Sequence, residues 1–271
     1  MLSYRQKFLR SIEKPIDFWA ERSSKLTWFK QPTSIMKQHP SKPNNTVWFD
    51  GGMTNQCFNC IDRHLPKFKD NTALIAESFV TKDSRSITYG RLHEDVQALA
   101  SFLKASGIKK GDRVLIYMPM IYEAVLSMLA CARLGAIHVV VFGGFAAPEL
   151  AKRIKFAEPA MILTATGSEE ASGPVPYLPK VKTALDITGK DIPVVVKSRC
   201  ENTENLPQLH EYPKWKNFDE QMYKYNGHVF DAVPVESNHP LYIIYTSGTT
   251  GNPKGIVRET GDFMVALDFT M

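Results

Sequence analysis

Short apolar runs alternate with segments of helical periodicity from residue 88 onward. After Thr88, the apolar residues Leu92, Val96, Leu99 and Phe102 recur three or four positions apart, which predicts a helix. Apolar runs of the length of one buried strand occupy residues 113–118, 138–142, 160–165, 193–198 and 241–247. Buried strands that alternate with helices favour a parallel sheet. We therefore predict an α/β fold with largely parallel sheets and helices on both faces.

Turn-forming residues mark the ends of these elements. Thr88 is a favourable helix N-cap, Pro148 stands where a proline opens a helix, and Gly107 and Gly135 are helix stop signals. Three segments rich in proline, glycine and polar residues lie between the predicted elements. We expect loops over 166–180 and 199–215 and a linker over 31–46.

The amino-terminal segment differs in charge from the rest. Residues 1–43 hold nine Lys or Arg against three Asp or Glu, although the whole chain has a net charge of only +5. The cations alternate with apolar residues as in an amphipathic helix with a solvated polar face. We predict a basic helical arm and linker over residues 1–43 and a larger domain over residues 44–271. Nucleic-acid binding by the arm is a weaker alternative, so we expect no nucleic-acid partner.

Composition favours a globular protein outside the membrane. The chain has 271 residues, of which 44% are hydrophobic, so it can bury a sizeable core. Its most apolar stretch, residues 114–145, is interrupted by Pro119, Glu123 and Arg133. No uncharged apolar run of about 18 residues survives, and we expect no membrane partner.

Cys57 and Cys60 stand in a C-x-x-C spacing, which suits redox chemistry or half of a zinc site. Zinc needs a second pair of ligands, and neither Cys131, Cys200 nor a histidine pair offers one at short spacing. The favoured interpretation is that both cysteines are helix residues of a reducing compartment.

The stretch YTSGTTGNPKG, residues 245–255, follows a predicted strand and combines hydroxyls, glycines and a lysine. Ligands of open α/β sheets bind beyond the carboxyl ends of the strands. Glycines let the backbone approach a ligand, hydroxyls donate hydrogen bonds and the lysine is cationic, so polyphosphate is the matching ligand. The spacing is not that of a Walker A loop, because Pro253 stands where its second glycine belongs. A polar turn between a strand and a helix is the alternative.

The order of these residues resembles the phosphate-binding signature of AMP-forming acyl-CoA synthetases. The segments WFDGGMTNQCFNCIDRHL, SITYGRLHEDVQALASFLKASGIKKGDRVLIYMPM, MLACARLGAIHVVVFGGF and GIVRETGDF are similar to the amino-terminal part of the acetyl- and propionyl-CoA synthetase branch. The similarity spans essentially the whole chain. Arg258, in GIVRETG, is nearer to the propionyl-type members. The resemblance implies the first part of the large amino-terminal domain of an adenylate-forming enzyme.

The resemblance also implies an activity. A short-chain carboxylate, propionate or acetate, would react with ATP to give an acyl-adenylate, and coenzyme A would then displace AMP. Mg²⁺ and Lys254 would offset the charge of the β- and γ-phosphates, and no side chain is expected to be a metal ligand. The residues implied to cradle those phosphates are Thr246, Ser247, Gly248, Thr249, Thr250 and Gly251.

Other matching segments are expected to support the fold. FGGF, residues 142–145, is expected to permit close packing at the end of a strand, and His64 is expected to be a hydrogen-bonded packing residue rather than a base. The residues expected to anchor the amino-terminal segment are Gly51, Gly52, Asn55, Asp62, Arg63 and His64.

The chain departs from the family at two places. Glu170 and Gly173 stand where acetyl-type members place arginines that contact the 3′-phosphate of coenzyme A, so the resemblance does not supply that contact here. Asp262 replaces the second glycine of a TGG segment and adds a negative charge near the nucleotide.

The family's catalytic lysine and mobile carboxy-terminal domain would lie beyond Met271, so we expect this chain alone not to complete acyl activation. The alternative is a short non-catalytic paralogue that binds nucleotide, or associates with itself or a full-length relative. Its unfinished sheet would expose an apolar strand edge. Because Tyr4 already matches the opening of the family, we expect no cleavable transit peptide. A cytoplasmic location is expected, with the mitochondrion as the alternative.

Overall fold

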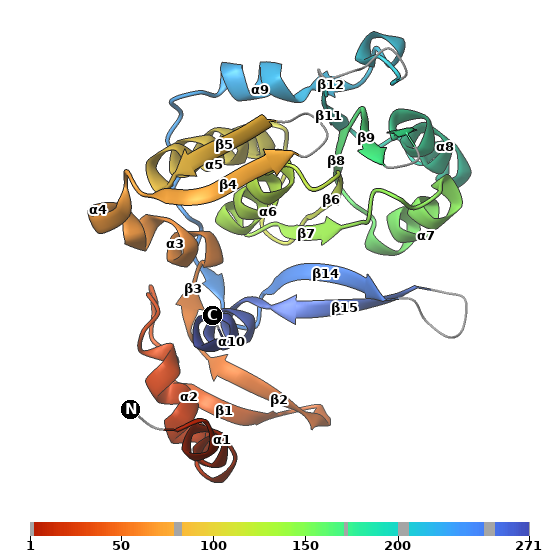
Figure 1. Cartoon of the computed structure of the whole chain (residues 1–271). Helices are drawn as coiled ribbons and strands as arrows, with labels where there is room; N and C mark the ends of the chain where they lie inside the picture. The colour runs from red at the N-terminus through yellow and green to blue at the C-terminus, as the bar shows by residue number, and fades with distance from the viewer. Residues whose placement is uncertain (1–2, 79–82, 171–172, 200–205, 247–252, 271) are drawn as a thin grey trace.

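The computed structural model describes residues 3–78, 83–170, 173–199, 206–246 and 253–270. Its centre is a sheet with the strand order β12, β11, β8, β6, β7, β14, β15 (Figure 1). Neighbouring strands from β12 to β14 run parallel, whereas β15 runs antiparallel to β14. The strands are β6 (Arg113–Tyr117), β7 (Ile137–Val140), β8 (Met161–Ala165), β11 (Val194–Lys197), β12 (Lys216–Asn217), β14 (Pro240–Thr246) and β15 (Lys254–Glu259).

Helices cover both faces of this sheet because successive side chains of a strand point to opposite sides. In β6, Val114 and Ile116 belong to one apolar core, while Leu115 and Tyr117 belong to another on the opposite face. The first core is completed by α5 (Tyr89–Ala105) and α6 (Tyr122–Leu134), and the second by α7 (Ala147–Ala157) and α8 (Leu178–Thr188). The predicted α/β fold is therefore confirmed.

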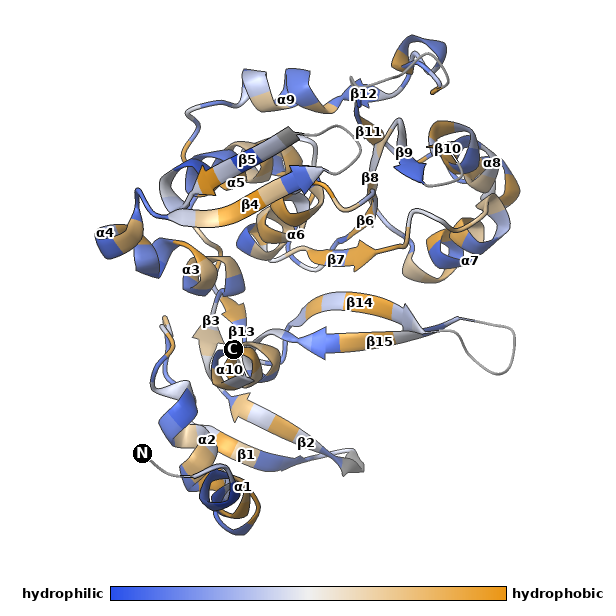
Figure 2. Ribbon diagram, viewed as in Figure 1, coloured by the Kyte–Doolittle hydropathy of each residue, from blue (hydrophilic) through white to orange (hydrophobic). Residues whose placement is uncertain are grey.

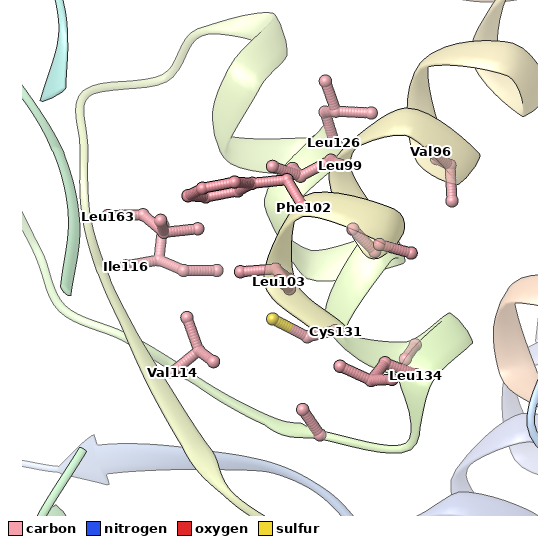
Figure 3. Close-up of a cluster of buried hydrophobic side chains, with 14 of the residues drawn as sticks. Val96, Leu99, Phe102, Leu103, Val114, Ile116, Leu126, Cys131, Leu134 and Leu163 are labelled. Atoms are coloured by element: carbon pink, nitrogen blue, oxygen red, sulfur yellow. The ribbon is translucent and has the colours of Figure 1, made fainter. Parts of the chain in front are cut away.

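The two apolar cores lie between the helices and the strands. Figure 2 shows hydrophobic residues along the strands of the sheet, most clearly in β7. Figure 3 shows the first core, where Phe102 and Leu99 of α5 face Ile116 and Leu163 of the sheet. These four side chains are 0–1% exposed. Full burial of one such side chain stabilises the fold by about 1.5–3 kcal/mol. The apolar periodicity of the sequence is thus the main source of stability for this half of the sheet.

The predicted helix boundaries follow from local capping. The Thr88 hydroxyl accepts a hydrogen bond from the Arg91 amide at 3.1 Å and so caps α5. Pro148 lies in the first turn of α7. Gly107 and Gly135 adopt φ of +91° and +75°, the left-handed conformation that ends α5 and α6 without strain on a Cβ atom.

Two segments are more regular than predicted. The expected linker at 31–46 contains a β-hairpin of β1 (Ser34–His39) and β2 (Lys42–Asp50), so the predicted boundary at residue 43 falls within a strand. The expected loop at 166–180 contains a second hairpin, β9 (Gly167–Glu170) and β10 (Gly173–Pro176). Both loop predictions were wrong because prolines and glycines that signal turns are tolerated in two-stranded hairpins, where each strand has an open edge.

The amino-terminal segment packs against the last helix of the chain. Phe18 and Val265 are nearly fully buried, and the Arg22 guanidinium lies 4.9 Å from the centre of the Phe269 ring. The predicted helical arm is present as two helices, of which α1 buries none of its side chains.

The remaining elements are α1 (Tyr4–Glu13), α2 (Pro15–Ser23), β3 (Met53–Thr54), α3 (Gln56–Cys60), η1 (Asp62–His64), α4 (Leu65–Phe68), β4 (Thr72–Ser78), β5 (Asp83–Thr88), η3 (Leu209–Glu211), α9 (Phe218–Lys224), β13 (Val235–Glu236) and α10 (Thr260–Thr270). None of the described helices is both long enough and apolar enough to traverse a lipid bilayer.

Candidate functional site

The predicted phosphate-binding stretch joins the two strands of a hairpin. Thr246 is the last residue of β14 and Lys254 the first of β15, and the two stand opposite each other in the antiparallel register. The side chains of both are exposed. The segment therefore links strand to strand, so the helix that the polar-turn alternative placed after it is wrong. The predicted site residues Ser247, Gly248, Thr249, Thr250 and Gly251 lie outside the described residues.

The flanks of this stretch lie at the carboxyl edge of the sheet. β14 runs parallel to β7, with Tyr242 opposite His138 and Ile243 opposite Val139. Because β7 is in turn parallel to β6 and β6 to β8, the carboxyl ends of all four strands lie along one edge. The predicted position of the stretch at the carboxyl edge of the sheet is confirmed for its described end, Thr246.

The FGGF segment follows β7 at the same edge and is packed closely, as predicted. A Cβ atom on Gly143 would lie 1.9 Å from the Tyr177 hydroxyl oxygen, so only glycine fits there. The Tyr117 hydroxyl donates to the backbone oxygens of Gly143, at 2.8 Å, and Phe145, at 2.7 Å. Burial raises the pKa of Tyr117, which keeps its hydroxyl protonated as a donor.

One buried cation lies beside both segments. The Arg153 side chain, on α7, is 5% exposed and lies over two aromatic rings, Phe145 of the FGGF segment and Tyr245 of β14. Sequence reasoning missed Arg153, because an arginine on an amphipathic helix is usually solvated. It also missed Tyr117 and Tyr177, since a tyrosine in an apolar run is indistinguishable from a core residue.

Asp262 lies away from the phosphate-binding stretch. It is in the first turn of α10, beyond the end of β15, and Lys254 begins that strand. A strand of this length spans about 20 Å, so the carboxylate acts on the stretch only at long range. Burial raises the pKa of Asp262, although a hydrogen bond from the Phe263 amide and the charge of Arg258 act in the opposite direction.

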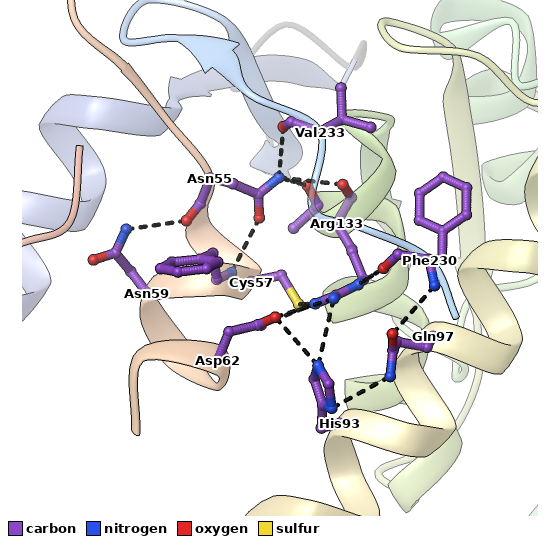
Figure 4. A network of polar contacts seen from close by, with 11 residues as sticks. Asn55, Cys57, Asn59, Asp62, His93, Gln97, Arg133, Phe230 and Val233 are labelled. Atoms are coloured by element: carbon purple, nitrogen blue, oxygen red, sulfur yellow. Dashed lines mark hydrogen bonds and ion pairs between the residues drawn. The ribbon is translucent and has the colours of Figure 1, made fainter. Parts of the chain in front are cut away.

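Two of the residues expected to anchor the amino-terminal segment, Asn55 and Asp62, belong to a buried polar network (Figure 4). Asn55 Nδ2 donates to the backbone oxygens of Ala132, at 2.8 Å, and Val233, at 2.9 Å. Asp62 accepts two hydrogen bonds from the Arg133 guanidinium, at 2.9 and 3.0 Å. Burial alone would raise the pKa of Asp62, but hydrogen bonds from His93 and Arg133 lower it overall. The anchoring prediction is confirmed for Asn55 and Asp62.

His64 is a hydrogen-bonded packing residue and both cysteines of the C-x-x-C spacing are helix residues, as predicted. His64 accepts from Arg63 Nε at 3.2 Å, and its ring packs beside Phe68 and Tyr89. Cys57 and Cys60 lie on α3, and burial raises the pKa of Cys57 to about 12, which leaves its thiol protonated and unreactive.

A metal ion held entirely by protein would need several ligands close together. Across the described residues, no cluster of three or more His, Cys, Asp or Glu side chains is arranged to hold one. Mg²⁺ usually keeps several waters and binds substrate phosphates, so a nucleotide site does not require such a cluster. The exposed Thr246 hydroxyl and Lys254 ammonium, opposite each other, suit the phosphate part of such a complex.

The described site and fold agree with one family of known proteins. The family model for AMP-binding enzymes matches residues 61–270, and the model for the acetyl-coenzyme A synthetase N-terminus matches residues 4–60. The chain belongs to the AMP-binding enzyme family. The family match includes the FGGF segment, both flanks of the phosphate-binding stretch and Arg153.

Relatives of known name include short-chain acyl-CoA synthetases. The chain is 44% identical over 269 residues to the mitochondrial acyl-CoA synthetase short-chain family member 3 of Bos taurus, covering 99% of this chain and 38% of the relative. It is 40% identical over 272 residues to the acetyl-coenzyme A synthetase of Leptospira biflexa, covering 98% of this chain and 41% of the relative. The chain thus spans about two fifths of the length of these AMP-binding enzymes.

A solved structure shares the fold. The acetoacetyl-CoA synthetase of Streptomyces lividans superposes with a TM-score of 0.85 at 22% identity, over 99% of this chain and 40% of the other. This likeness supports the architecture of the AMP-binding chain described here, including the mostly parallel sheet covered on both faces.

Proposed function

We propose that the chain is part of an enzyme that activates a short-chain carboxylic acid, propionate or acetate, with ATP and transfers the acyl group to coenzyme A. The observation that carries this proposal is the placement of the phosphate-binding stretch. Its two ends, Thr246 and Lys254, lie opposite each other at the carboxyl edge of a parallel sheet, within a region that matches the AMP-binding enzymes.

The proposed role of the stretch is to position pyrophosphate as a leaving group. A carboxylate is a poor acyl donor, and its conversion to a mixed anhydride with AMP supplies a better leaving group. Negative charge grows on the departing pyrophosphate, and one preorganised donor is typically worth about 3 kcal/mol toward such a transition state. Thr246, Ser247, Gly248, Thr249, Thr250 and Gly251 are the proposed phosphate-binding residues, with Lys254 as a mobile cation. Mg²⁺ would share in neutralising the phosphates when it is bound.

The acid and the coenzyme A contact are finer parts of the proposal. Arg258 supports propionate over acetate, by its likeness to propionyl-type members. The β9–β10 hairpin, which follows β8 at the carboxyl edge, presents Glu170 and Gly173 rather than arginines, so the 3′-phosphate of coenzyme A needs cations from elsewhere. We propose the cytoplasm as the location, with the mitochondrion as the alternative.

The residues of this chain would supply nucleotide binding but not the whole of the proposed acyl activation. Residues 44–271 would form the incomplete adenylating domain, and the mobile carboxy-terminal domain with its catalytic lysine is not among them. We expect this chain to bind MgATP without completing acyl activation. A non-catalytic nucleotide-binding paralogue, alone or associated with itself or a relative, is the second candidate, since it uses the same stretch.

Nucleotide binding is tested by calorimetric titration of MgATP into the chain. The expected result is saturable binding that is weakened at least tenfold by Lys254→Ala and left unchanged by Lys104→Ala, which removes an exposed cation on α5. Equal binding by both variants would overturn the phosphate-site assignment.

A trapping reaction tests whether this chain alone completes adenylation. With ATP, propionate and hydroxylamine, acyl-adenylate formation yields a hydroxamate. We expect the chain to give no more hydroxamate than its Lys254→Ala variant. Hydroxamate formation well above that variant would show that this chain suffices for adenylation and would contradict the partial-activity proposal.

A further inference from the structure

Arg153 has a buried charge that is held by its own helix. Its guanidinium donates to the Glu149 backbone oxygen at 2.7 Å and to a Glu149 carboxylate oxygen at 2.9 Å. Glu149 and Arg153 are one helical turn apart on α7, so this pairing orients the guanidinium through local geometry. The Glu149 carboxylate is partly exposed, whereas the arginine is not. The charge is therefore directed inward and is not part of a solvated helix face.

The inward side of Arg153 contacts two segments that are far apart in the sequence. Its Cζ atom is 4.2 Å from the centre of the Phe145 ring and 5.6 Å from the centre of the Tyr245 ring. A guanidinium over an aromatic face is attractive, and the attraction grows when water is excluded. Phe145 belongs to the FGGF segment, and Tyr245 is the residue before Thr246. One cation thus joins the two segments at the carboxyl edge.

Tyr245 in turn contacts both strands that flank the phosphate-binding stretch. It stands opposite Gly255 in the β14–β15 register, and a Cβ atom on Gly255 would lie 3.2 Å from Tyr245 Cε1. The Tyr245 ring therefore lies over Gly255, the residue after Lys254. Because Thr246 and Lys254 are the immediate neighbours of these two residues, the position of the ring determines the position of both ends of the stretch.

We propose that Arg153 is a positioning residue for nucleotide binding, which holds the flanks of the phosphate-binding stretch in register with the FGGF segment. This inference rests on the proposed function, because it assigns the stretch to phosphate. The physical basis is preorganisation: a site whose supporting side chains are fixed before the ligand arrives loses less entropy on binding. The Tyr117 hydroxyl fixes the other side of the same arrangement by its hydrogen bond to the Phe145 backbone oxygen.

An apolar side chain of similar volume at position 153 would not replace the hydrogen bonds of the arginine. Methionine at position 153 would fill a similar volume against Phe145 and Tyr245, but it would lose both hydrogen bonds to Glu149. The rings would then be packed without a preferred orientation toward α7. The Glu149 carboxylate is 39% exposed and also accepts a hydrogen bond from Lys152, so removing the arginine leaves no buried unpaired charge. Stability and nucleotide affinity are therefore expected to separate here.

The experiment compares MgATP affinity among variants of the whole 271-residue chain. Arg153→Met is expected to raise the Kd for MgATP about tenfold, and Arg153→Lys, which keeps the cation, is expected to recover part of that loss. Tyr245→Leu removes the partner ring and is expected to weaken binding by a similar factor. The double variant is expected to be no weaker than either single one, because both act through the same contact.

The matched control is Arg113→Met. Arg113 also contacts α7, through hydrogen bonds to the backbone oxygens of Ala157, at 2.8 Å, and Glu158, at 2.9 Å, but it lies at the amino end of β6. This variant is expected to lower the melting temperature and leave the Kd unchanged. It separates loss of stability from loss of positioning.

The possible results distinguish the two proposals. If the wild-type chain does not bind MgATP, the proposed function fails and the inference fails with it. If the wild-type chain binds and Arg153→Met, Arg153→Lys and Tyr245→Leu all bind equally well, the inference alone is overturned. If Arg153→Met does not fold, the Arg153→Lys and Tyr245→Leu variants decide: wild-type affinity in both contradicts the inference.

Discussion

His138 is a buried histidine whose protonation opposes folding. It lies on β7, is 8% exposed, and stacks on the Tyr242 ring of β14 with ring centres 5.4 Å apart. Tyr242 in turn packs edge-on against Phe263 of α10. Among the described residues, His138 Nδ1 has no hydrogen-bond partner. A proton on this ring would therefore place a charge in an apolar site without a compensating group.

The free-energy cost of protonating His138 in the folded state makes the free energy of unfolding depend on pH. Burial lowers the pKa of His138 from its ordinary value of 6.5 to about 4. Because the unfolded chain binds the proton more readily, the free energy of unfolding falls as the pH drops below the unfolded pKa. The two pKa values give a loss of about 2 kcal/mol between about pH 7 and pH 5, and a limit of about 3 kcal/mol below pH 4.

The assay is urea unfolding followed by circular dichroism, at a series of pH values, for the wild-type chain and His138→Phe. Phenylalanine keeps an aromatic ring against Tyr242 and removes the titration. We expect the difference in unfolding free energy between the two proteins to change by about 2 kcal/mol from about pH 7 to pH 5. His210→Gln, at an exposed histidine, is expected to show the wild-type profile. Parallel profiles for wild type and His138→Phe would refute the reasoning.

Three further predictions concern packing, charge and capping. Gly143→Ala would place a methyl group against the buried Tyr177 hydroxyl and is expected to lower the unfolding free energy by about 1–3 kcal/mol, measured by chemical denaturation; an unchanged midpoint would contradict the packing. Arg133→Met leaves the Asp62 carboxylate without its main partner and is expected to cost about 3–5 kcal/mol, an effect that Asp62→Asn in the same chain should partly reverse. Thr88→Ala removes the cap of α5 and is expected to lower stability by about 1 kcal/mol, seen as a melting-temperature shift; no shift would show that the cap is dispensable.

The local elements were predictable where the signals act over a few residues. The helix after Thr88 and the strand at 113–118 follow from apolar spacing, and their structural bounds differ by one to two residues from the prediction. The 31–46 segment was predicted as a linker because Pro32 and Pro40 signal turns. Its strands form because β1 and β2 pair with each other and pack against α2 and α10, and α10 lies at the other end of the chain.

The candidate site likewise has residues that the sequence indicated and supporting residues that it did not. Its proposed chemistry comes from the sequence, because hydroxyls, glycines and a lysine in one short stretch suit the binding of an anion. Its support was not readable, because Arg153 belongs to no motif and its partner Tyr245 is 92 positions away in the chain. In an amphipathic helix, the neighbouring residues in the sequence do not distinguish a buried arginine from a solvated one.

The class of fold, the ends of α5, α6 and α7 and the stretch proposed to bind phosphate follow from local signals in the sequence, because periodicity, caps and glycine conformations act between near neighbours. Only the tertiary structure decided which strands are adjacent, that β15 returns antiparallel to β14, and that the Asp62 and Arg133 charges are paired across 71 positions. Those contacts arise when apolar faces of distant segments are buried together, and their partners are chosen by shape and charge in the packed state.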